Sequence, residues 1–300
     1  MIKVKIIKDS TNWLGSRLTT MILEYPRYIH SELMTHRVFS RNASSTRAIP
    51  YNTFKETTIK EFFYPIWTFN QKGMQGKIVD ELDIIQQSNK IHEEIFGLIS
   101  PKLDELNNLN IHKQNINRYM ESFQVIKVLV TATNWDNFLL LRNHEAAQPE
   151  IQELAKCIDK ELKNSKPEYL QPGEWHIPFD IDNDLDIIMS ERLQMSTAKC
   201  ARISYNNVDG TNSSLQKDLN LYDRLVGANP KHLSPTEHQA CVPKEDQLDG
   251  FNCYYTKKFN GGNPKMIYVK GPYHSNLEGW IQYRKLIEND LDIKNYVSWD

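Results

Sequence analysis

The chain has 300 residues, of which 40% are hydrophobic and 25% charged, and its formal net charge at pH 7 is −2. This balance is typical of a globular protein, and we expect a single domain over residues 1–300. No run of about 18 apolar residues predicts a membrane span, and the amino terminus lacks the apolar core of a signal peptide. The near-neutral charge does not favour nucleic acid as a partner, so we expect a cytoplasmic protein that binds small molecules.

The four cysteines are widely spaced and form no Cys-x-x-Cys pair: Cys157, Cys200, Cys241 and Cys253. Neither a zinc ribbon nor a thioredoxin-type redox motif is therefore indicated. In a reducing cytosol such thiols stay free and serve in packing. The sequence predicts no metal site.

Hydrophobic periodicity predicts the elements of the amino-terminal half. Pro26 suits the first turn of a helix, and Ile29 and Leu33 would anchor that helix from one face. In chain order we predict strands at 2–6 and 18–24, a helix that ends near His36 and Arg37, a polar loop at 40–46, a helix at 82–99 and a short helix begun by the cap pair Ser100-Pro101.

The carboxy-terminal half contains more helices. The apolar run in 115–133 predicts either a buried strand or a buried helix, and Pro149 opens an amphipathic helix. Beyond it we predict a long connection at 164–190, a helix capped by Ser196, a helix at 215–225, a loop at 231–239 that enters a helix, a strand at 265–269 and a final helix that carries Trp280.

The stretch from Glu32 to Arg47, ELMTHRVFSRNASSTR, concentrates hydrogen-bond donors and has little apolar mass. A phosphate needs several charge-assisted donors, and Arg47 with the hydroxyls of Ser44 and Ser45 could supply them. Main-chain N–H groups of such a loop can add an anion-binding nest. The alternative is a solvated loop whose arginine forms a surface salt bridge.

A second polar cluster contains Asn137, Arg142 and Gln148. Because Arg142 follows three leucines, we expect it to leave a buried stripe, where a guanidinium requires an acceptor. The carbonyl edge of a pyrimidine ring offers such an acceptor to a planar fork. The alternative is an internal ion pair with Glu145 or Glu150.

Two further clusters consist of Arg202 with Ser204 and of His232, Ser234, Glu237 and His238. The two histidines are six residues apart, which is not the four-residue spacing of a helical zinc site. Ser234 followed three residues later by Glu237 predicts a capping box.

Together these motifs resemble the flavin-dependent thymidylate synthases, the ThyX type. THRVFSRNASSTR is similar to the family's Arg-His-Arg followed by seven residues and Ser, and NWDNFLLLRNHEAAQPEI is similar to its later Asn-Phe-Leu motif. CARISY at 200–205 resembles the family's Ala-Arg-x-Ser, and HLSPTEH at 232–238 resembles His-x-Thr/Ser-Pro-Phe-Glu-His. The segments 51–110 and 241–300 are matched less well.

The order of the motifs differs from that of the familiar members. The counterparts of CARISY and HLSPTEH come first in those members but last in this chain. The chain therefore resembles a circularly permuted, bacteriophage-like form of the family, a rearrangement that folds tolerate when the chain ends lie close together. The resemblance implies an α/β (α+β) fold with an antiparallel sheet packed with helices.

The resemblance also implies a reaction, the reductive methylation of dUMP to dTMP. Methylenetetrahydrofolate would supply the carbon, reduced FAD the reducing equivalents and NADPH their source. The family uses no cysteine nucleophile, and its members are homotetramers with active sites shared between subunits.

Residue roles follow from the matched positions. Arg142 would polarise the pyrimidine, and Ser45 would hold the 5′-phosphate instead of acting as a nucleophile, since no adjacent base is identifiable. The remaining nucleotide positions are Glu32, Ser44, Arg47 and Arg118, and the flavin positions are His36, Arg37, Asn42, Asn137, Gln148, Ser204, His232, Ser234 and Glu237.

Three positions depart from the family pattern where substrate and flavin should meet. Thr35 and Thr133 each replace an arginine, and Ala43 replaces a glutamate. They motivate one alternative, a relative that acts on dCMP or releases a hydroxymethyl product. A second alternative is a non-catalytic nucleotide-binding homologue.

Overall fold

The computed structural model describes residues 2–73, 75–180, 187–203, 214–244 and 275–288, together with the strands at 253–256 and 265–268. Its helices are α1 His30–Met34, α2 Tyr51–Lys60, α3 Leu82–Asn108, α4 Lys113–Ile116, α5 Asp136–Arg142, α6 Pro149–Asn164, α7 Met189–Ala201, α8 Leu215–Val226 and α9 Tyr283–Glu288, with 3-10 turns η1 Arg27–Ile29, η2 Asn117–Phe123 and η3 Ser234–Glu237. None of the helices in these ranges has the length and apolarity to cross a membrane.

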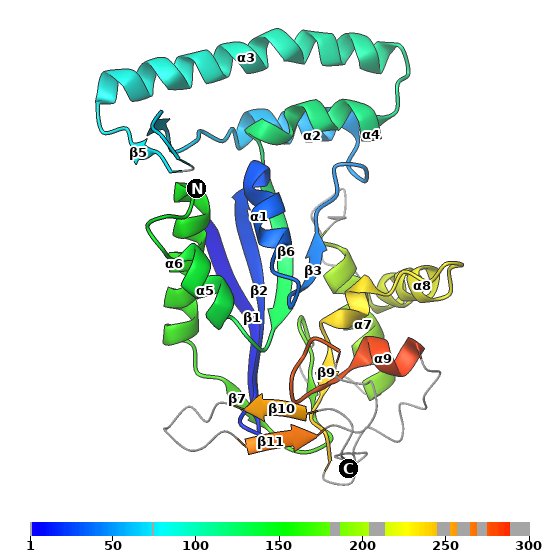
Figure 1. The fold of residues 1–300 in the computed structure, drawn as a ribbon. Helices are drawn as coiled ribbons and strands as arrows, with labels where there is room; N and C mark the ends of the chain where they lie inside the picture. The colour runs from blue at the N-terminus through cyan, green and yellow to red at the C-terminus, as the bar shows by residue number, and fades with distance from the viewer. Residues whose placement is uncertain are drawn as a thin grey trace.

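Five strands form the main sheet in the order β3-β6-β2-β1-β7 (Figure 1). They are β1 Lys3–Asn12, β2 Arg17–Pro26, β3 Ser40–Ala43, β6 Val125–Ala132 and β7 Glu168–Leu170. The first four in spatial order pair antiparallel, but β7 runs parallel to β1, so the expected antiparallel sheet is wrong at this edge. Because α5 and α6 carry the chain from β6 across the sheet, the next strand can return in the same direction.

Shorter strands form small sheets outside the main one. They are β4 Thr68–Phe69, β5 Lys77–Ile78, β8 Trp175–His176, β9 Ala240–Cys241, β10 Cys253–Thr256, β11 Lys265–Tyr268 and β12 Ile281–Gln282. β11 confirms the strand predicted at 265–269. β7 and β8 interrupt what we expected to be a long connection at 164–190.

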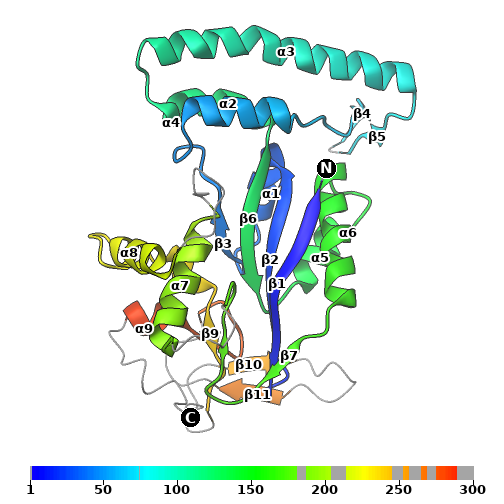
Figure 2. The same cartoon turned by 180° about the vertical axis from the view of Figure 1, so that it is seen from behind.

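Helices α1, α5 and α6 cover one face of the main sheet (Figures 1 and 2). Pro149 is the first residue of α6, as predicted, and its apolar stripe, including Ile151, Leu154 and Ile158, is fully buried against the sheet. The segment that could have been strand or helix is the strand β6. Its residues from Val128 to Ala132 are all buried, which explains why the run lacks alternation.

Helix α3 lies with α2 and α4 beyond one end of the sheet (Figure 1). It continues through Ser100 and Pro101 to Asn108, so the prediction of a new helix at Ser100-Pro101 is wrong. Tertiary packing overrides the local signal, because Leu103 on the far side of the proline is buried against Tyr51 and Phe54 of α2.

Helices α7, α8 and α9 form a third part of the molecule beside the β3 edge (Figure 1). The prediction that Ser196 caps a helix is wrong, because Ser196 lies inside α7. Its buried hydroxyl donates to the carbonyl of Pro178 at 2.5 Å. Trp280 also lies outside the final helix, which begins only at Tyr283.

Candidate functional site

The first half of the predicted loop at 40–46 is the edge strand β3, paired with β6. Its polar side chains are buried against other parts of the chain instead of solvated. Ser40 is 1% and Asn42 7% exposed, and the Asn42 amide donates to the carbonyl of Cys200 at 3.3 Å. The loop prediction failed because the partners of these polar groups come from distant segments.

The strongest link between the predicted clusters joins His36 to Arg142. Helix α1 ends at Met34, so Thr35 and His36 follow it directly. Arg142, at the end of α5, donates from Nε to His36 Nε2 at 3.1 Å and from Nη2 to Thr35 Oγ1 at 3.2 Å. Neither predicted ion pair of Arg142 forms within the described part of the chain. Glu150 instead accepts from the Gln148 amide and from the main chain of Ile66.

The prediction that Arg142 leaves a buried stripe is wrong. Leu140 and Leu141, which precede it, are 74% and 52% exposed, and Phe138 is the buried residue of α5. The guanidinium is therefore half-buried and open to a ligand on one side.

The environment of His36 keeps its ring neutral. Its ring stacks on Phe39 at 5.9 Å and meets the edge of Phe138 at 4.9 Å. Burial lowers the pKa of His36, and the positive charges of Arg142 and Arg41 lower it further. Because Nε2 accepts the bond from Arg142, the proton of the neutral ring lies on Nδ1.

Arg41 belongs to the site, although the sequence motifs did not single it out. Its Nη1 donates to the carbonyls of Met34 and His36 at 3.1 and 3.2 Å. Burial lowers the pKa of Arg41, whereas the charge of Glu237 opposes this shift. Arg41 thus connects the end of α1 with η3, a position that spacing alone does not reveal.

Beyond β3 the predicted phosphate segment forms a turn. The Ser45 hydroxyl accepts from the main-chain N–H of Arg47 at 3.3 Å, and the side chain of Arg47 is exposed. Ser44 accepts from Arg27 through both its carbonyl, at 3.1 Å, and its hydroxyl, at 3.4 Å. Three predicted phosphate residues, Ser44, Ser45 and Arg47, thus lie in one turn.

Arg27 is a second residue that the motifs missed. Its side chain lies 6.0 Å above the ring of Phe54, and burial is the main cause that lowers its pKa to about 10. Its Nε is buried and has no hydrogen-bond partner among the described residues. The predicted Arg118 lies near it, since both arginines act on Glu121, with Arg118 3.7 Å from that carboxylate.

The turn η3 carries Ser234 and Glu237, but the predicted capping box does not form. Leu233 holds the N-cap position, and no side chain bonds to the cap. Glu237 instead forms an ion pair with Arg284 of α9, a third residue that the motifs missed. Ser234 and His232 are exposed.

Several predicted flavin residues do not contact the others within one chain. Arg37, Asn137 and Gln148 are exposed, and the Glu32 side chain interacts with its neighbour Ser31. Ser204 lies outside the described residues. His36, which follows α1, thus contacts Arg142, and Asn42 on β3 lies beside η3, which carries Glu237. Arg37, Asn137 and Gln148 remain on the surface.

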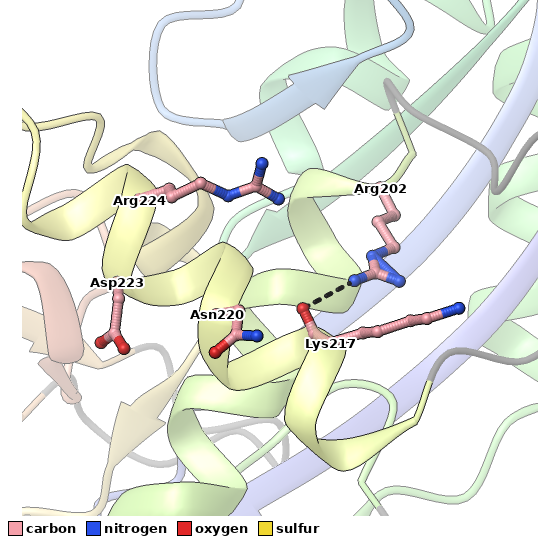
Figure 3. A pocket seen from close by; sticks show the side chains of 5 residues that line it. All are labelled: Arg202, Lys217, Asn220, Asp223 and Arg224. Atoms are coloured by element: carbon pink, nitrogen blue, oxygen red, sulfur yellow. Dashed lines mark hydrogen bonds between the residues drawn. The ribbon is translucent and has the colours of Figure 1, made fainter.

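A pocket of about 630 Å³ opens between the end of α7 and α8 (Figure 3). Arg202, Lys217, Asn220, Asp223 and Arg224 line it. Arg202 is held in place by Asp218 at 2.9 Å and by the carbonyl of Lys217 at 3.2 Å. The pocket is thus separate from the His36–Arg142 contact. Within the ranges described, no cluster of His, Cys, Asp and Glu suits a metal ion.

Comparison with known proteins identifies the family. Residues 16–168, which are 153 of the 300, match the family described as Thymidylate synthase complementing protein, Thy1. The chain belongs to the Thy1 family. The Thy1 match contains Thr35–Arg47 and α5, so it confirms the family recognised from those two motifs. The motifs at 200–205 and 232–238 lie outside it.

Among relatives of this Thy1 protein, a flavin-dependent thymidylate synthase of Aquifex aeolicus is 29% identical over 169 residues. The match covers 51% of this chain and 50% of the relative, so the chain spans about half of that protein's length. Crystal structures of a UMP/dUMP methylase, PolB from Streptomyces cacaoi, bound with 5-Br UMP or 5-Br dUMP are 16% identical. They cover 57% of this chain and 91% or 92% of PolB, with TM-scores of 0.45 and 0.44.

Proposed function

We propose that the protein is a flavin-dependent thymidylate synthase that methylates dUMP to dTMP with methylenetetrahydrofolate, FAD and NADPH. The observation that carries this proposal is the bond between Arg142 and His36. It joins the two family motifs at one point, although they lie about a hundred residues apart in the sequence. Among the described residues, the hydrogen bonds of the Arg142 side chain go to the neutral groups of His36 and Thr35, so its positive charge is available to a ligand.

The residues around His36 fit the chemistry of a flavin. An isoalloxazine ring needs an apolar surface together with a few polar groups at its edges. Phe39, Phe138 and Trp135 form an aromatic cluster beside His36, and Asn42 and Glu237 lie on the neighbouring strand and turn. When bound, the reduced flavin would supply the reducing equivalents of the reaction.

The groups around Ser44 fit a phosphate. Ser45 and Arg47 hold a turn with main-chain donors, and Arg27 and Arg118 add positive charge. The unpartnered Nε of Arg27 is a buried donor of the kind that a phosphate oxygen satisfies. In this assignment Ser44, Ser45, Arg47 and Arg118 bind the 5′-phosphate and Arg142 orients and polarises the pyrimidine.

We further propose that the sites are shared between subunits of a homotetramer. The exposed flavin positions are Arg37, just beyond α1, and Asn137 on α5, and both elements also expose apolar residues, including Met34 at 44% and Leu140 at 74%. Polar site residues set in an apolar surface are typical of an interface. A second chain placed there would complete the site.

The circular permutation is part of the proposal. The Thy1 match covers the motifs that come late in familiar members, and CARISY and HLSPTEH follow it in the chain. In the fold η3 lies against β3, which brings the rotated motifs beside the Arg-His-Arg region. Glu237 then lies near Arg41, as a shared flavin site requires.

One observation favours a second candidate, a relative that acts on dCMP or forms a hydroxymethyl product. Thr35, which replaces an arginine of the family, directly contacts Arg142. The pyrimidine-binding arginine therefore has a neutral neighbour, which changes the acceptors that the site favours.

The deciding experiment incubates the purified protein with FAD, NADPH, methylenetetrahydrofolate and either dUMP or dCMP, followed by mass analysis of the nucleotide. The proposal predicts dTMP from dUMP. A product from dCMP, or a gain of one hydroxymethyl group, would establish the second candidate. Protein that stays colourless after incubation with FAD but binds dUMP would instead be a non-catalytic nucleotide-binding homologue.

A further inference from the structure

The segment 275–288 reaches the candidate site, although the family resemblance assigns it no role. Gln282 is fully buried, and its amide nitrogen lies 3.3 Å from the hydroxyl of Ser40 and 3.2 Å from the carbonyl of Glu237. One side chain thus bridges β3 and η3, the two elements that carry the candidate flavin residues Asn42 and Glu237.

Asn276 reinforces this bridge from the same segment. Its amide donates to the carbonyl of Val38 at 2.7 Å and to the Ser40 hydroxyl at 3.0 Å, and its oxygen lies 3.1 Å from Gln282 Nε2. The segment is itself rigid, because Leu277, Trp280 and other apolar residues anchor it in the core. The hydrogen bonds therefore fix β3 to a firm support.

Arg284 makes the charged contact of the segment. It forms an ion pair with Glu237, and its Nε donates to Glu288 at 2.6 Å. Glu237 also raises the pKa of Arg41 against the effect of burial, so this carboxylate lies between two arginines from different elements. Arg284 lies outside every motif that the resemblance matched, and Arg41 lies within one but has no assigned role there.

A packing role alone does not account for these contacts. The Gln282 Oε1 is buried without a hydrogen-bond partner among the described residues, which destabilises the fold. Arg284 could pair with Glu288 alone if its only task were to stabilise α9. It reaches back to η3 instead.

We propose that Gln282 and Arg284 are positioning residues of the flavin site, with Gln282 setting the separation of β3 and η3 and Arg284 orienting and neutralising Glu237. This inference rests on the proposed flavin-dependent function. It assigns to the carboxy-terminal segment a part of the site that lies outside the region matched to the Thy1 family. The two residues act through others and do not touch the reacting atoms.

The two roles have different signatures. Without Arg284 the carboxylate of Glu237 loses its counter-charge and opposes the negative charge that a flavin gains on reduction. The midpoint potential of the bound flavin should then become more negative. Without the Gln282 amide the site loses its geometry but no charge, so the affinity for FAD should fall while the potential stays the same.

The test compares Arg284→Gln, Arg284→Lys and Gln282→Leu with the wild-type chain, using FAD titration and redox titration of the bound flavin. Lys285→Gln is the matched control, because it removes one positive charge from the same helix beside the same Glu288. We expect Arg284→Gln to weaken FAD binding at least about tenfold and to lower the midpoint potential. Arg284→Lys should restore the potential, and Gln282→Leu should weaken binding alone.

Each outcome decides the inference. Arg284→Gln behaving like Lys285→Gln in both titrations would overturn it. If Arg284→Gln does not fold, Gln282→Leu still decides, because wild-type FAD affinity in that variant would refute the positioning role. Failure of the wild-type chain to bind FAD would instead overturn the proposed function and this inference together.

Discussion

At the scale of single residues, the proposed function depends on the pair Arg142 and His36. Arg142→Ala should lower turnover at least about a hundredfold, because it removes the group that polarises the pyrimidine, and should leave the fold intact, because the side chain is only half-buried. It should also raise the pKa of His36, since one of the charges that lower it is gone. Steady-state kinetics and an NMR titration of His36 measure the two effects.

Lys156→Ala is the control for that experiment. It removes a positive charge from an exposed position on α6, where the Lys156 ammonium donates to the side chain of Gln152 on the same helix. Turnover and the His36 titration should both stay as in the wild-type chain. An Arg142→Ala variant with normal turnover would refute the role assigned to this arginine.

A buried chain of hydrogen bonds makes two other histidines sensitive to acid. The hydrogen bonds run from Ser10 to His176 at 2.9 Å and from His176 to Thr20 at 2.8 Å. They continue from Thr20 to Thr131 at 2.7 Å and from Thr131 to His238 at 2.8 Å. Burial lowers the pKa of His238 to about 3 and lowers that of His176 well below its ordinary value. Both rings are therefore neutral in the folded protein near pH 7.

The sign of the pH dependence follows from these lowered values. Between the folded-state pKa and the ordinary value near 6.5, the unfolded chain binds more protons, so the free energy of unfolding rises with pH. Acidification from pH 7 to pH 5 should cost about 2 kcal/mol for each of the two histidines. Urea unfolding at the two pH values measures the loss.

Substitution shows whether these rings are responsible. His238→Asn can keep the bond to Thr131 but cannot titrate, so it should remove its own share of the loss, about 2 kcal/mol. His144→Asn alters an exposed histidine and should change nothing. An equal loss in the His238→Asn variant would contradict the argument.

At the scale of elements, the local sequence predicted those segments whose hydrophobic pattern is strongly periodic or whose partners are nearby in the chain. β1, β2 and α6 follow directly from alternation and from the apolar stripe behind Pro149. β3 could not be predicted, because its polar residues are satisfied by Cys200 and Asn276, more than 150 residues away. Ser100-Pro101 likewise has the local form of a helix start, and only the packing of Leu103 shows that α3 continues.

Helix α3 also exposes an apolar stripe. Ile91, Ile95 and Leu98 lie at intervals of four and three and are 57%, 46% and 75% exposed. In the proposed homotetramer this stripe is a contact between copies. Ile91→Lys combined with Leu98→Lys should therefore reduce the mass of the particle in light scattering while the circular dichroism stays unchanged.

The control for this helix is Gln86→Lys, which adds a lysine at an exposed position of α3 outside the apolar stripe. It should leave the mass unchanged. An unchanged mass in the double variant as well would exclude α3 from the subunit contact.

At the scale of the whole molecule, the site residues are distributed over three parts of one chain. The family could be recognised from sequence because two motifs keep their residue order, and the match to Thy1 confirms it. The supporting residues Arg27, Arg41 and Arg284 could not be predicted, because each gains its role from contacts made only after folding. In the proposed homotetramer, the exposed Arg37 and Asn137 would face a second chain.

The separation of the nucleotide residues predicts how the assembly works. In one chain Arg142 contacts Thr35 and His36 before β3, whereas Arg47 follows it, and the four residues of β3 alone span about 13 Å. One nucleotide is therefore bound more easily by Arg142 of one subunit and Arg47 of another. Arg142→Ala and Arg47→Ala should each be inactive alone, but mixed assemblies should regain activity because some sites then contain both arginines. Co-expression with two different affinity tags isolates the mixed particles. Tandem-purified particles that stay inactive, although each variant alone binds FAD, would show that every site is built from one chain.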